Sequence, residues 1–366
     1  MKIKQKVLLG LSGGVDSAVA TIILQNQGYE VIGAFMKCFS EEKNKITGEC
    51  PWIDDLKEAQ KIATKLKIKF IVLDYEKEYA NEVIKPMFKS YSEGKTPNPD
   101  ADCNTVIKFP FLLREAKKLG CKYIATGHYA KKIEKNGKFY LKIPKDKYKD
   151  QTYFLYGISQ ENLKNTLFPI GDYTKSQVRQ IAKKHKLTNW NRQSTRGLCF
   201  IGNIDMKNFL KQKLKINQGN ITSPEGKLVG KHQGIQFFTI GERIGENENL
   251  HINNEYRNET KSKLYIAEKN KKTNTIIVAP ENHKALFKNQ FQIKKAIFTT
   301  NKPRGSLNNI KIRIRHLGQL IPANITKKNK NIIVNLKKAI QGIAEGQSCV
   351  IYTNQGIMLG GGEITY

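Results

Sequence analysis

The fold follows from the stretch Gly10-Leu11-Ser12-Gly13-Gly14-Val15-Asp16-Ser17, which lies between the first apolar run and the first amphipathic run. Adjacent glycines let backbone amides approach an anion closely, and a helix N-terminus adds partial positive charge. The stretch therefore predicts a phosphate-binding loop between a strand and a helix. It has neither the G-K-[ST] ending of the Walker loop nor the G-x-G-x-x-G spacing of dinucleotide enzymes, so it indicates neither class.

Short apolar runs and amphipathic stretches alternate around this loop, which predicts a parallel sheet covered by helices on both faces. A helix is expected between the second and third strands, because Leu56, Ala59 and Ala63 share one helical face with Leu66. Thr174 and Gln177 have the spacing of a capping box and predict another helix. The expected strands are 6–11, 30–36, 69–74 and 122–126.

The pattern changes after about residue 205, where turn-rich segments separate short β-type runs. This predicts two small, mainly β modules that meet near residue 284, with an exposed loop at 246–260. The expected domains are therefore 1–205, 206–283 and 284–366. The expected strands are 236–240, 264–267, 275–278, 311–315, 331–336 and 348–352.

The charge of the chain is strongly positive, with 63 Lys and Arg against 32 Asp and Glu, or +31. Residues 261–340 alone hold 19 basic residues against Glu268 and Glu281, and a second basic run spans 131–149. An uneven excess of this size predicts a partner made of phosphates, although solvated basic faces are also common.

Composition and cysteine spacing argue against a membrane protein, a secreted protein and a protein with a structural zinc site. No run approaches the ~20 apolar residues of a membrane span, and the first residues do not resemble a signal peptide, so cytoplasmic residence and no membrane partner are expected. The six cysteines form no C-x-x-C pair and none has a His at zinc-ligand spacing, so no structural metal site is expected.

Two segments place a cysteine beside polar groups. In Thr96-Pro97-Asn98-Pro99-Asp100-Ala101-Asp102-Cys103-Asn104 the prolines predict a stiff loop before a helix that starts near Lys108. Asp100 would orient or deprotonate the Cys103 thiol, whose pKa a nearby helix start would lower. A buried, inert cysteine is the alternative.

The second segment is Ser194-Thr195-Arg196-Gly197-Leu198-Cys199-Phe200-Ile201-Gly202, where Arg196 would stabilise a thiolate at Cys199. Two loop cysteines in a cytoplasmic chain indicate sulfur or redox chemistry rather than a structural disulfide. The spacing does not establish that the two cysteines meet.

The S-G-G-x-D-S arrangement resembles the pyrophosphate loop (PP-loop) of the N-type ATP pyrophosphatases. With the segments above, the chain resembles the tRNA-specific 2-thiouridylases over nearly its whole length. The other matching motifs are Ala125-Thr126-Gly127-His128-Tyr129-Ala130, Lys149-Asp150-Gln151-Thr152-Tyr153-Phe154-Leu155, Gly230-Lys231-His232-Gln233-Gly234, Thr239-Ile240-Gly241-Glu242-Arg243, Glu345-Gly346-Gln347-Ser348 and Leu359-Gly360-Gly361-Gly362.

The resemblance implies a Rossmann-like parallel-sheet ATP pyrophosphatase domain followed by two small mainly β domains, the last a β-barrel. It implies ATP-dependent 2-thiolation of the wobble uridine of tRNAs of the Lys, Glu and Gln type, through adenylation of uracil O2. ATP, assisted by Mg2+, would bind at Gly10, Leu11, Ser12, Gly13, Gly14, Val15, Asp16, Ser17, the main chain of Met36, and Gly127.

In the same resemblance, Cys199 carries a persulfide, Cys103 is the nucleophile that attacks C2 or releases the sulfur, and Asp100 is the acid/base group. The implied partners are the anticodon region of tRNA and a persulfide donor, a cysteine desulfurase acting directly or through a relay protein. The implied tRNA contacts are Asn98, Pro99, Asp100, His128, Lys149, Asp150, Gln151, Arg313, Arg315 and Gln347.

The chain departs from the family pattern at four places. A Trp is common shortly after Met36-Lys37, where this chain has Cys38-Phe39, and Ile314 stands where a Tyr between two Arg is common. Arg196 stands where a small or hydroxyl residue is more usual, and 203–205 lacks a common basic residue. The alternatives are another PP-loop enzyme, such as a 4-thiouridine synthase or an adenylating amidotransferase, or a tRNA or rRNA binder without catalysis.

Overall fold

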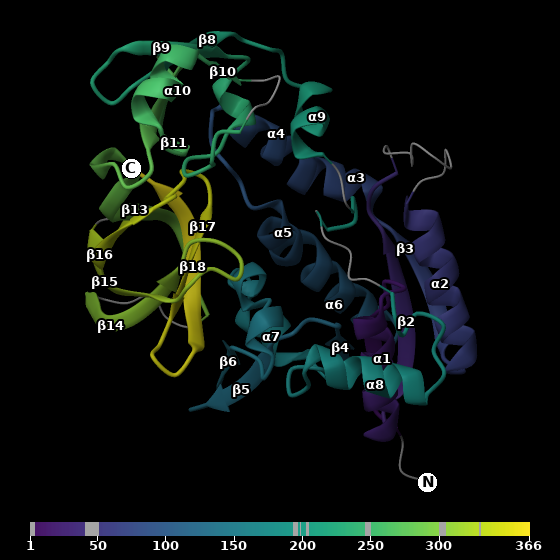
Figure 1. The fold of residues 1–366 in the computed structure, drawn as a ribbon. Coiled ribbons are helices and arrows are strands. Elements are labelled where there is room, and N and C mark those ends of the chain that lie inside the picture. The colour runs from purple at the N-terminus through teal and green to yellow at the C-terminus, as the bar shows by residue number, and fades with distance from the viewer. Residues whose placement is uncertain are drawn as a thin grey trace.

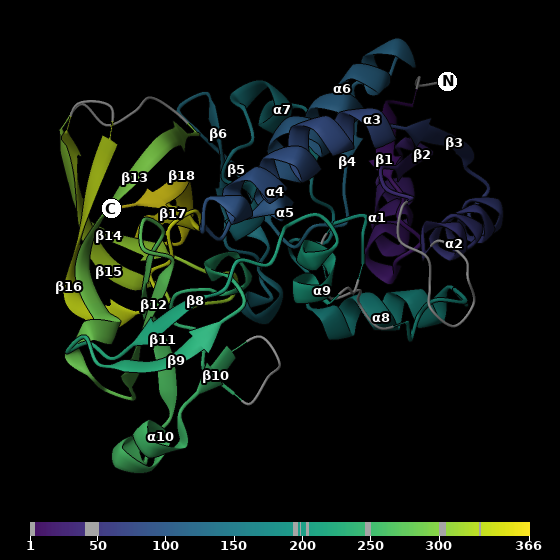
Figure 2. The same cartoon turned by 90° about the horizontal axis from the view of Figure 1, so that it is seen from above.

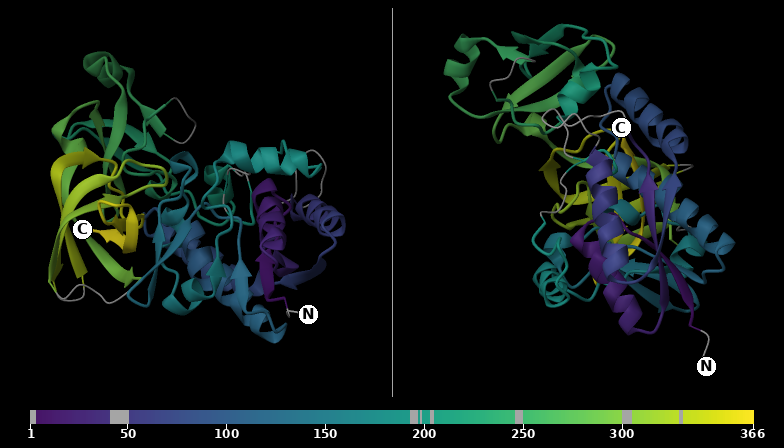
Figure 3. Two further views of the ribbon diagram at one scale, coloured as in Figure 1. Left: turned by 90° about the horizontal axis from the view of Figure 1, so that it is seen from below. Right: turned by 90° about the vertical axis from the view of Figure 1, so that its right-hand side faces the viewer.

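The structure is a computed structural model of the 366-residue chain. It describes residues 4–40, 51–192, 197, 199–202, 205–245, 250–299, 305–328 and 331–366. The parallel sheet and the C-terminal strands lie at opposite ends of the molecule (Figure 3).

The N-terminal half is built on a parallel sheet in the order β3-β2-β1-β4-β7. All four strands predicted for this region are confirmed within one residue at each end. Val7, Leu8 and Leu9 are fully buried, as expected for a strand covered on both faces. The strands are β1 (Lys6–Gly10), β2 (Glu30–Lys37), β3 (Lys69–Asp74), β4 (Tyr123–Ala125) and β7 (Thr166–Leu167).

Helices cover both faces of this sheet, as Figure 2 shows. On one face, α1 (Val15–Asn26), α2 (Pro51–Lys65) and α8 (Lys175–Lys184) share a core with Val7 and Leu9. On the other face, α6 (Phe109–Lys118) packs with Leu8. The predicted capping box is present, since the Thr174 and Gln177 side chains each bond the other's backbone. No helix in the described ranges is long and apolar enough to cross a membrane.

The expectation of a stiff loop at 96–107 is wrong beyond Asn98. Pro99 instead begins a short helix, α5 (Pro99–Asp102), which continues as a π-helix, η2 (Cys103–Lys108), into α6. Proline is tolerated at the first helical position because its missing N–H has no helical partner there. The Asn98 side chain caps the helix by accepting from the Ala101 amide. The chain reaches it through α3 (Glu76–Tyr79), η1 (Ala80–Ile84) and α4 (Lys85–Ser92).

The remaining elements of the N-terminal half are short. A hairpin formed by β5 (Lys131–Lys135) and β6 (Lys138–Lys142) uses much of the second basic run. The other elements are η3 (Lys147–Lys149), η4 (Thr152–Leu155), α7 (Gln160–Lys164) and α9 (Met206–Lys211).

A second sheet has the order β10-β9-β8-β12-β11, with β8 and β12 parallel and the other pairs antiparallel. The strands predicted at 264–267 and 275–278 are confirmed within β11 and β12, whereas 236–240 is not a strand, because η5 (Ile235–Phe237) is a 3-10 turn. The strands are β8 (Gly219–Thr222), β9 (Leu228–His232), β10 (Leu250–Ile252), β11 (Leu264–Asn270) and β12 (Thr275–Pro280).

The expectation of an exposed loop at 246–260 is wrong for the part of this segment that the structure describes. Residues 250–252 form β10, and α10 (Asn254–Thr260) follows, while 246–249 lie outside the described residues. Leu250, Ile252 and Tyr256 are buried, so three apolar side chains outweigh the many polar residues around them.

The third region is a closed barrel of six antiparallel strands in the order β13-β16-β15-β14-β17-β18, closed by pairing of β13 with β18 (Figure 1). The predicted fold class is therefore confirmed. The barrel follows η6 (Lys284–Leu286) and consists of β13 (Phe287–Phe298), β14 (Ser306–Arg313), β15 (Ile321–Lys328), β16 (Asn331–Gln341), β17 (Ser348–Tyr352) and β18 (Ile357–Thr365).

The barrel is joined to the N-terminal half by strand pairing and by buried side chains. Strand β18 pairs with β6, so the hairpin extends the barrel sheet. The Tyr153 hydroxyl donates to the carbonyls of Ile314 and Ser348 at 3.2 and 2.9 Å. These contacts place the barrel beside β6 and η4.

Candidate active site

The phosphate loop, Gly10–Ser17, has the compact backbone that its glycines predict. Gly13 has φ of +76°, and a Cβ atom there would lie 2.5 Å from the Asp55 carbonyl oxygen. The Ser17 hydroxyl donates to the Gly14 carbonyl at 3.0 Å and accepts from the Ser12 amide at 3.3 Å. Only glycine fits this turn, so the amides at the start of α1 can approach an anion closely.

Gly127, which follows β4, lies directly against this loop. A Cβ atom at Gly127 would be 2.7 Å from the Ser17 amide nitrogen and 2.9 Å from the Asp16 carbonyl carbon. Met36, the next-to-last residue of the neighbouring strand β2, is buried. The predicted nucleotide-binding residues therefore come together along one edge of the parallel sheet, at the carboxyl ends of its strands.

Asp16 is held by two residues that the sequence did not indicate. The Lys175 ammonium lies 2.7 and 2.8 Å from its carboxylate oxygens, and the Tyr129 hydroxyl donates to it at 2.9 Å. Asn189 also reaches the loop, because its side-chain amide donates to the Gly13 carbonyl at 2.9 Å. These partners lie far from the loop in the chain. Tyr129 belongs to the motif at 125–130, but that motif did not indicate a contact with Asp16.

Cys103 and Cys199 are brought into side-chain contact. A hydrogen bond links the two thiols, and both cysteines are free rather than joined in a disulfide. Cys103 is fully buried, whereas Cys199 is partly exposed. The sequence predicted both residues but not their meeting, and Arg196, the expected thiolate partner, lies outside the described residues.

The protonation of the two thiols differs. Burial raises the pKa of Cys103 well above its usual range, so the expectation of a lowered pKa at a helix start is wrong for this residue. The hydrogen bond from Cys103, together with the nearby Lys108 ammonium, lowers the pKa of Cys199, although desolvation acts in the opposite direction. Cys199 is therefore the thiol that ionises more readily, and its thiolate is the nucleophilic form.

Three further residues complete the cysteine pocket, which we define as Tyr79, Asp100, Cys103, Lys108 and Cys199. The Asp100 carboxylate accepts the Cys199 amide at 2.7 Å, and the Tyr79 hydroxyl donates to the Cys199 carbonyl at 2.7 Å. Burial raises the pKa of Asp100 above its ordinary value. The Lys108 Nζ atom lies 3.7 Å from the Cys199 sulfur.

His128 connects the cysteine pocket with the phosphate loop. It follows Gly127 directly, its ring stacks on Phe109 with centroids 5.8 Å apart, and its Nδ1 atom is 2.9 Å from the Thr126 hydroxyl. Phe109 in turn follows Lys108. Burial lowers the pKa of His128 well below its usual range, so this residue is neutral near pH 7.

Several of the predicted tRNA contacts lie at the junction with the barrel. Asn98 donates to the Ser348 hydroxyl at 3.0 Å, and the Thr96 amide donates to the Glu345 carbonyl at 2.8 Å. Pro99 is buried, while Gln347 is partly exposed and near the Tyr153 hydroxyl at 3.4 Å. A barrel loop therefore contacts the segment that carries Asp100.

The predicted tRNA contacts divide into exposed and buried residues. Lys149 and Arg315 are exposed. Arg313 and Asp150 are buried and form an ion pair with 2.5 Å between Arg313 Nη1 and Asp150 Oδ2. This pair joins the barrel to the N-terminal half, which is a structural role that the sequence did not indicate.

Gln151, another predicted tRNA contact, is also engaged within the protein. Its side-chain oxygen accepts a hydrogen bond from the Tyr129 backbone amide at 2.9 Å. The backbone amide of Gln151 donates to the Tyr129 carbonyl at 3.0 Å. The contact of each of these residues with tRNA stays a prediction.

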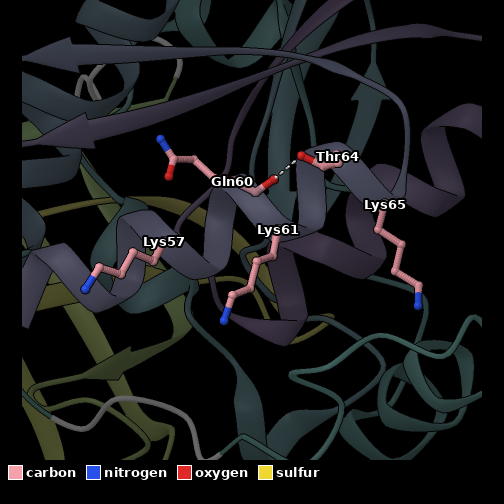
Figure 4. Close-up of a pocket in the computed structure, with 5 residues that line it drawn as sticks. All are labelled: Lys57, Gln60, Lys61, Thr64 and Lys65. Carbon is pink, nitrogen blue, oxygen red and sulfur yellow. Dashed lines mark hydrogen bonds between the residues drawn. The ribbon is translucent and has the colours of Figure 1, made fainter.

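A separate hollow on the surface is formed by α2 alone (Figure 4). Its residues are exposed, and the one hydrogen bond among them, from the Thr64 hydroxyl to the Gln60 carbonyl, is an ordinary contact within a helix. No group of three or more potential metal-ligating side chains occurs in the described part of the chain. The lining residues are Lys57, Gln60, Lys61, Thr64 and Lys65.

Three family models match successive parts of the chain. They are the tRNA methyl transferase HUP domain over residues 5–203, the tRNA methyl transferase PRC-barrel domain over 207–280 and the aminomethyltransferase beta-barrel domain over 288–364.

Relatives match over nearly the full length. The tRNA-specific 2-thiouridylase MnmA 1 of Geobacillus kaustophilus is 38% identical, with 96% of this chain and 93% of the relative covered. The tRNA-specific 2-thiouridylase MnmA of Clostridioides difficile is 37% identical, with 100% and 99% covered. That of Flavobacterium johnsoniae is 36% identical, with 99% and 100% covered. The chain belongs to the tRNA-specific 2-thiouridylase family.

Proposed function

We propose that this protein is an enzyme that replaces O2 of the wobble uridine in tRNA by sulfur, with ATP as the activating substrate. The observation that carries the proposal is the contact between Cys103 and Cys199 beside a loop shaped for phosphate. Sulfur transfer needs two thiols in reach of each other, and activation of a carbonyl oxygen needs a nucleotide nearby. The relatives' names point to the same reaction.

ATP fits the phosphate loop because Gly13 and Gly127 leave room that a Cβ atom would fill. Amides at the start of α1 would hold the phosphates, and the main chain of Met36 would hold the base. Mg2+ would neutralise phosphate charge. Since the Asp16 carboxylate already bonds Lys175 and Tyr129, we expect phosphate oxygens and water to supply most Mg2+ ligands.

In the proposed reaction, uracil O2 attacks the α-phosphorus of ATP and pyrophosphate leaves. The terminal sulfur of a Cys199 persulfide attacks C2 and AMP departs. Cys103 then attacks the Cys199 sulfur, which forms a Cys103–Cys199 disulfide and releases 2-thiouridine, and an external thiol reduces the disulfide. Asp100, which accepts a hydrogen bond from the Cys199 backbone amide, would accept or return a proton in these steps.

The tRNA would bind across the junction between α5 and the barrel. The contacts from Asn98 to Ser348 and from Thr96 to Glu345 keep barrel residues next to Asp100. Exposed basic residues such as Lys149 and Arg315 would contact phosphates, and the target uridine would leave its stack to reach the pocket. We propose domains of 1–205, 206–283 and 284–366, with a cysteine desulfurase or its relay protein as sulfur donor.

The test is a reaction of the protein with ATP, Mg2+, a persulfide donor and unmodified tRNA, followed by mass spectrometry of the nucleosides. We expect 2-thiouridine in the complete reaction and at least about a thousandfold less with Cys103→Ser or Cys199→Ser. Cys121→Ser, at a cysteine outside the pocket, is the matched control. The mass of the nucleoside also distinguishes exchange of oxygen for sulfur from addition of a methyl group. Addition of a methyl group would contradict the proposal.

A further inference from the structure

Lys108 is a charged residue of the pocket for which neither the sequence analysis nor the proposed reaction supplies a function. Its Nζ atom lies 3.7 Å from the Cys199 sulfur and 5.1 Å from the centroid of the Phe200 ring. Tyr79 supports the same loop, because its ring contacts Phe200 edge-on at 5.7 Å. The ammonium therefore faces the sulfur from one side and an aromatic ring from another.

The π-helix η2 explains how Lys108 reaches the sulfur. Cys103 and Lys108 are its first and last residues, five positions apart. In an α-helix, five residues turn by about 500°, which leaves the two side chains about 140° apart. A π-turn closes from i to i+5 and brings such residues closer to one face, and π-turns often occur at functional sites. The irregular helix therefore directs a thiol and a cation to one pocket.

The groups that act on the Cys199 thiol come from several elements. Cys103 donates a hydrogen bond to it, and Asp100 opposes its ionisation through negative charge. Cys38 at the end of β2 and Tyr79 are neutral, because burial raises the pKa of each far above its usual range. Among the described groups that influence Cys199, Lys108 is the cation.

We propose that Lys108 holds the sulfur of Cys199 in its anionic form, first as the thiolate that accepts sulfur and then as the persulfide anion. The persulfide part rests on the proposed function. In that step the Cys199 thiolate attacks the outer sulfur of the donor persulfide, R–S–SH, which gives Cys199–S–SH and R–S⁻. Loss of the persulfide proton leaves Cys199–S–S⁻, whose charge the Lys108 ammonium would balance. Lys108 would thus be a catalytic residue for sulfur transfer.

The test measures the rate at which iodoacetamide alkylates Cys199 across pH, with the Cys199 peptide quantified by mass spectrometry. In the wild-type protein the midpoint of this profile should lie below the ~8.5 of an ordinary cysteine. Lys108→Met should raise the midpoint and lower the rate at pH 7 by about tenfold or more. Lys108→Arg should stay near wild type, because it keeps the charge.

Lys118→Met is the matched control, since it removes an equal charge from an exposed residue of the next helix and should leave the profile unchanged. An unchanged midpoint in folded Lys108→Met would overturn the proposal. So would a wild-type midpoint at or above 8.5, a measurement that needs no variant to fold. The alkylation assay contains neither ATP nor tRNA, so its failure is separate from failure of the thiolation assay.

Discussion

The phosphate loop is formed by eight consecutive residues, whereas the cysteine pocket collects side chains from Tyr79 to Cys199. In the loop, backbone amides and the absence of Cβ atoms define the site, as Gly13 and Gly127 show. In the pocket, the charges and protons of buried side chains define it. The two regions adjoin through His128 and Phe109, so a region defined by shape lies beside a region defined by electrostatics.

This difference predicts how each region responds to substitution. The phosphate loop is defined by backbone atoms, so it should tolerate substitutions that change charge but not substitutions that add volume. A pocket made of buried ionisable groups tolerates small changes of volume, but each change of charge alters the protonation of its neighbours. The predictions below test whether the two regions can be altered separately.

The largest effect should come from the junction that lies outside both regions. Arg313→Met leaves Asp150 buried without its cation, although Thr152 still donates to it at 2.9 and 2.7 Å. We expect the free energy of unfolding to fall by about 3 kcal/mol or more. ATP affinity and the Cys199 alkylation profile of the folded protein should stay unchanged, because Arg313 contacts neither region.

Chemical denaturation, isothermal titration of ATP and alkylation measure these three properties. Arg315→Met is the control, since Arg315 is exposed and should cost little stability. A stability within about 0.5 kcal/mol of wild type would show that the ion pair does not hold the barrel. A change in either site would show that the barrel supports that site directly.

Gly127→Ala should alter the phosphate loop and leave the cysteine pocket unchanged. The new Cβ atom would lie 2.7 Å from the Ser17 amide nitrogen, so the start of α1 must move. We expect ATP affinity to fall by about 10- to 100-fold, measured by titration, while Cys199 alkylation keeps its profile. Gly245→Ala is the control because a Cβ atom there meets nothing within 4 Å. Unchanged ATP affinity would remove Gly127 from the site.

The sequence predicted the loop well because its signal is contiguous. A strand, adjacent glycines and a helix start follow one another, so local rules suffice. Four of the five strands of the parallel sheet and helix α2 were predicted for the same reason, since apolar periodicity is a local property. The fold class was therefore within reach of the sequence.

The pocket was only partly predictable because its partners are distant in the chain. Cys103 and Cys199 were found through their neighbours, but their contact depends on the tertiary fold. Lys108 requires a π-turn, and two prolines wrongly predicted a loop at the start of that segment. Arg313 and Asp150 are 163 positions apart, so no local pattern indicates a buried pair, and the family resemblance placed both among the tRNA contacts.

Asp100→Asn should have the smallest effect of these variants, but it tests the direction in which the pKa of Cys199 shifts. The Asp100 carboxylate raises the pKa of Cys199, so its loss should lower that pKa, opposite to the effect of Lys108→Met. The asparagine oxygen can still accept the Cys199 amide, which keeps the loop in place. We expect alkylation at pH 7 to rise by about threefold, while thiolation falls because the acid/base group is gone.

Asp102→Asn is the matched control for this prediction. It removes an equal charge two residues away, from an exposed carboxylate that is not among the groups acting on the Cys199 thiol. The alkylation profile should not move in this variant. A shift of the Asp100→Asn profile to higher pH would mean that the carboxylate acts through shape, as the glycines of the phosphate loop do. The contrast between a region made of shape and a region made of charge would then fail at Asp100.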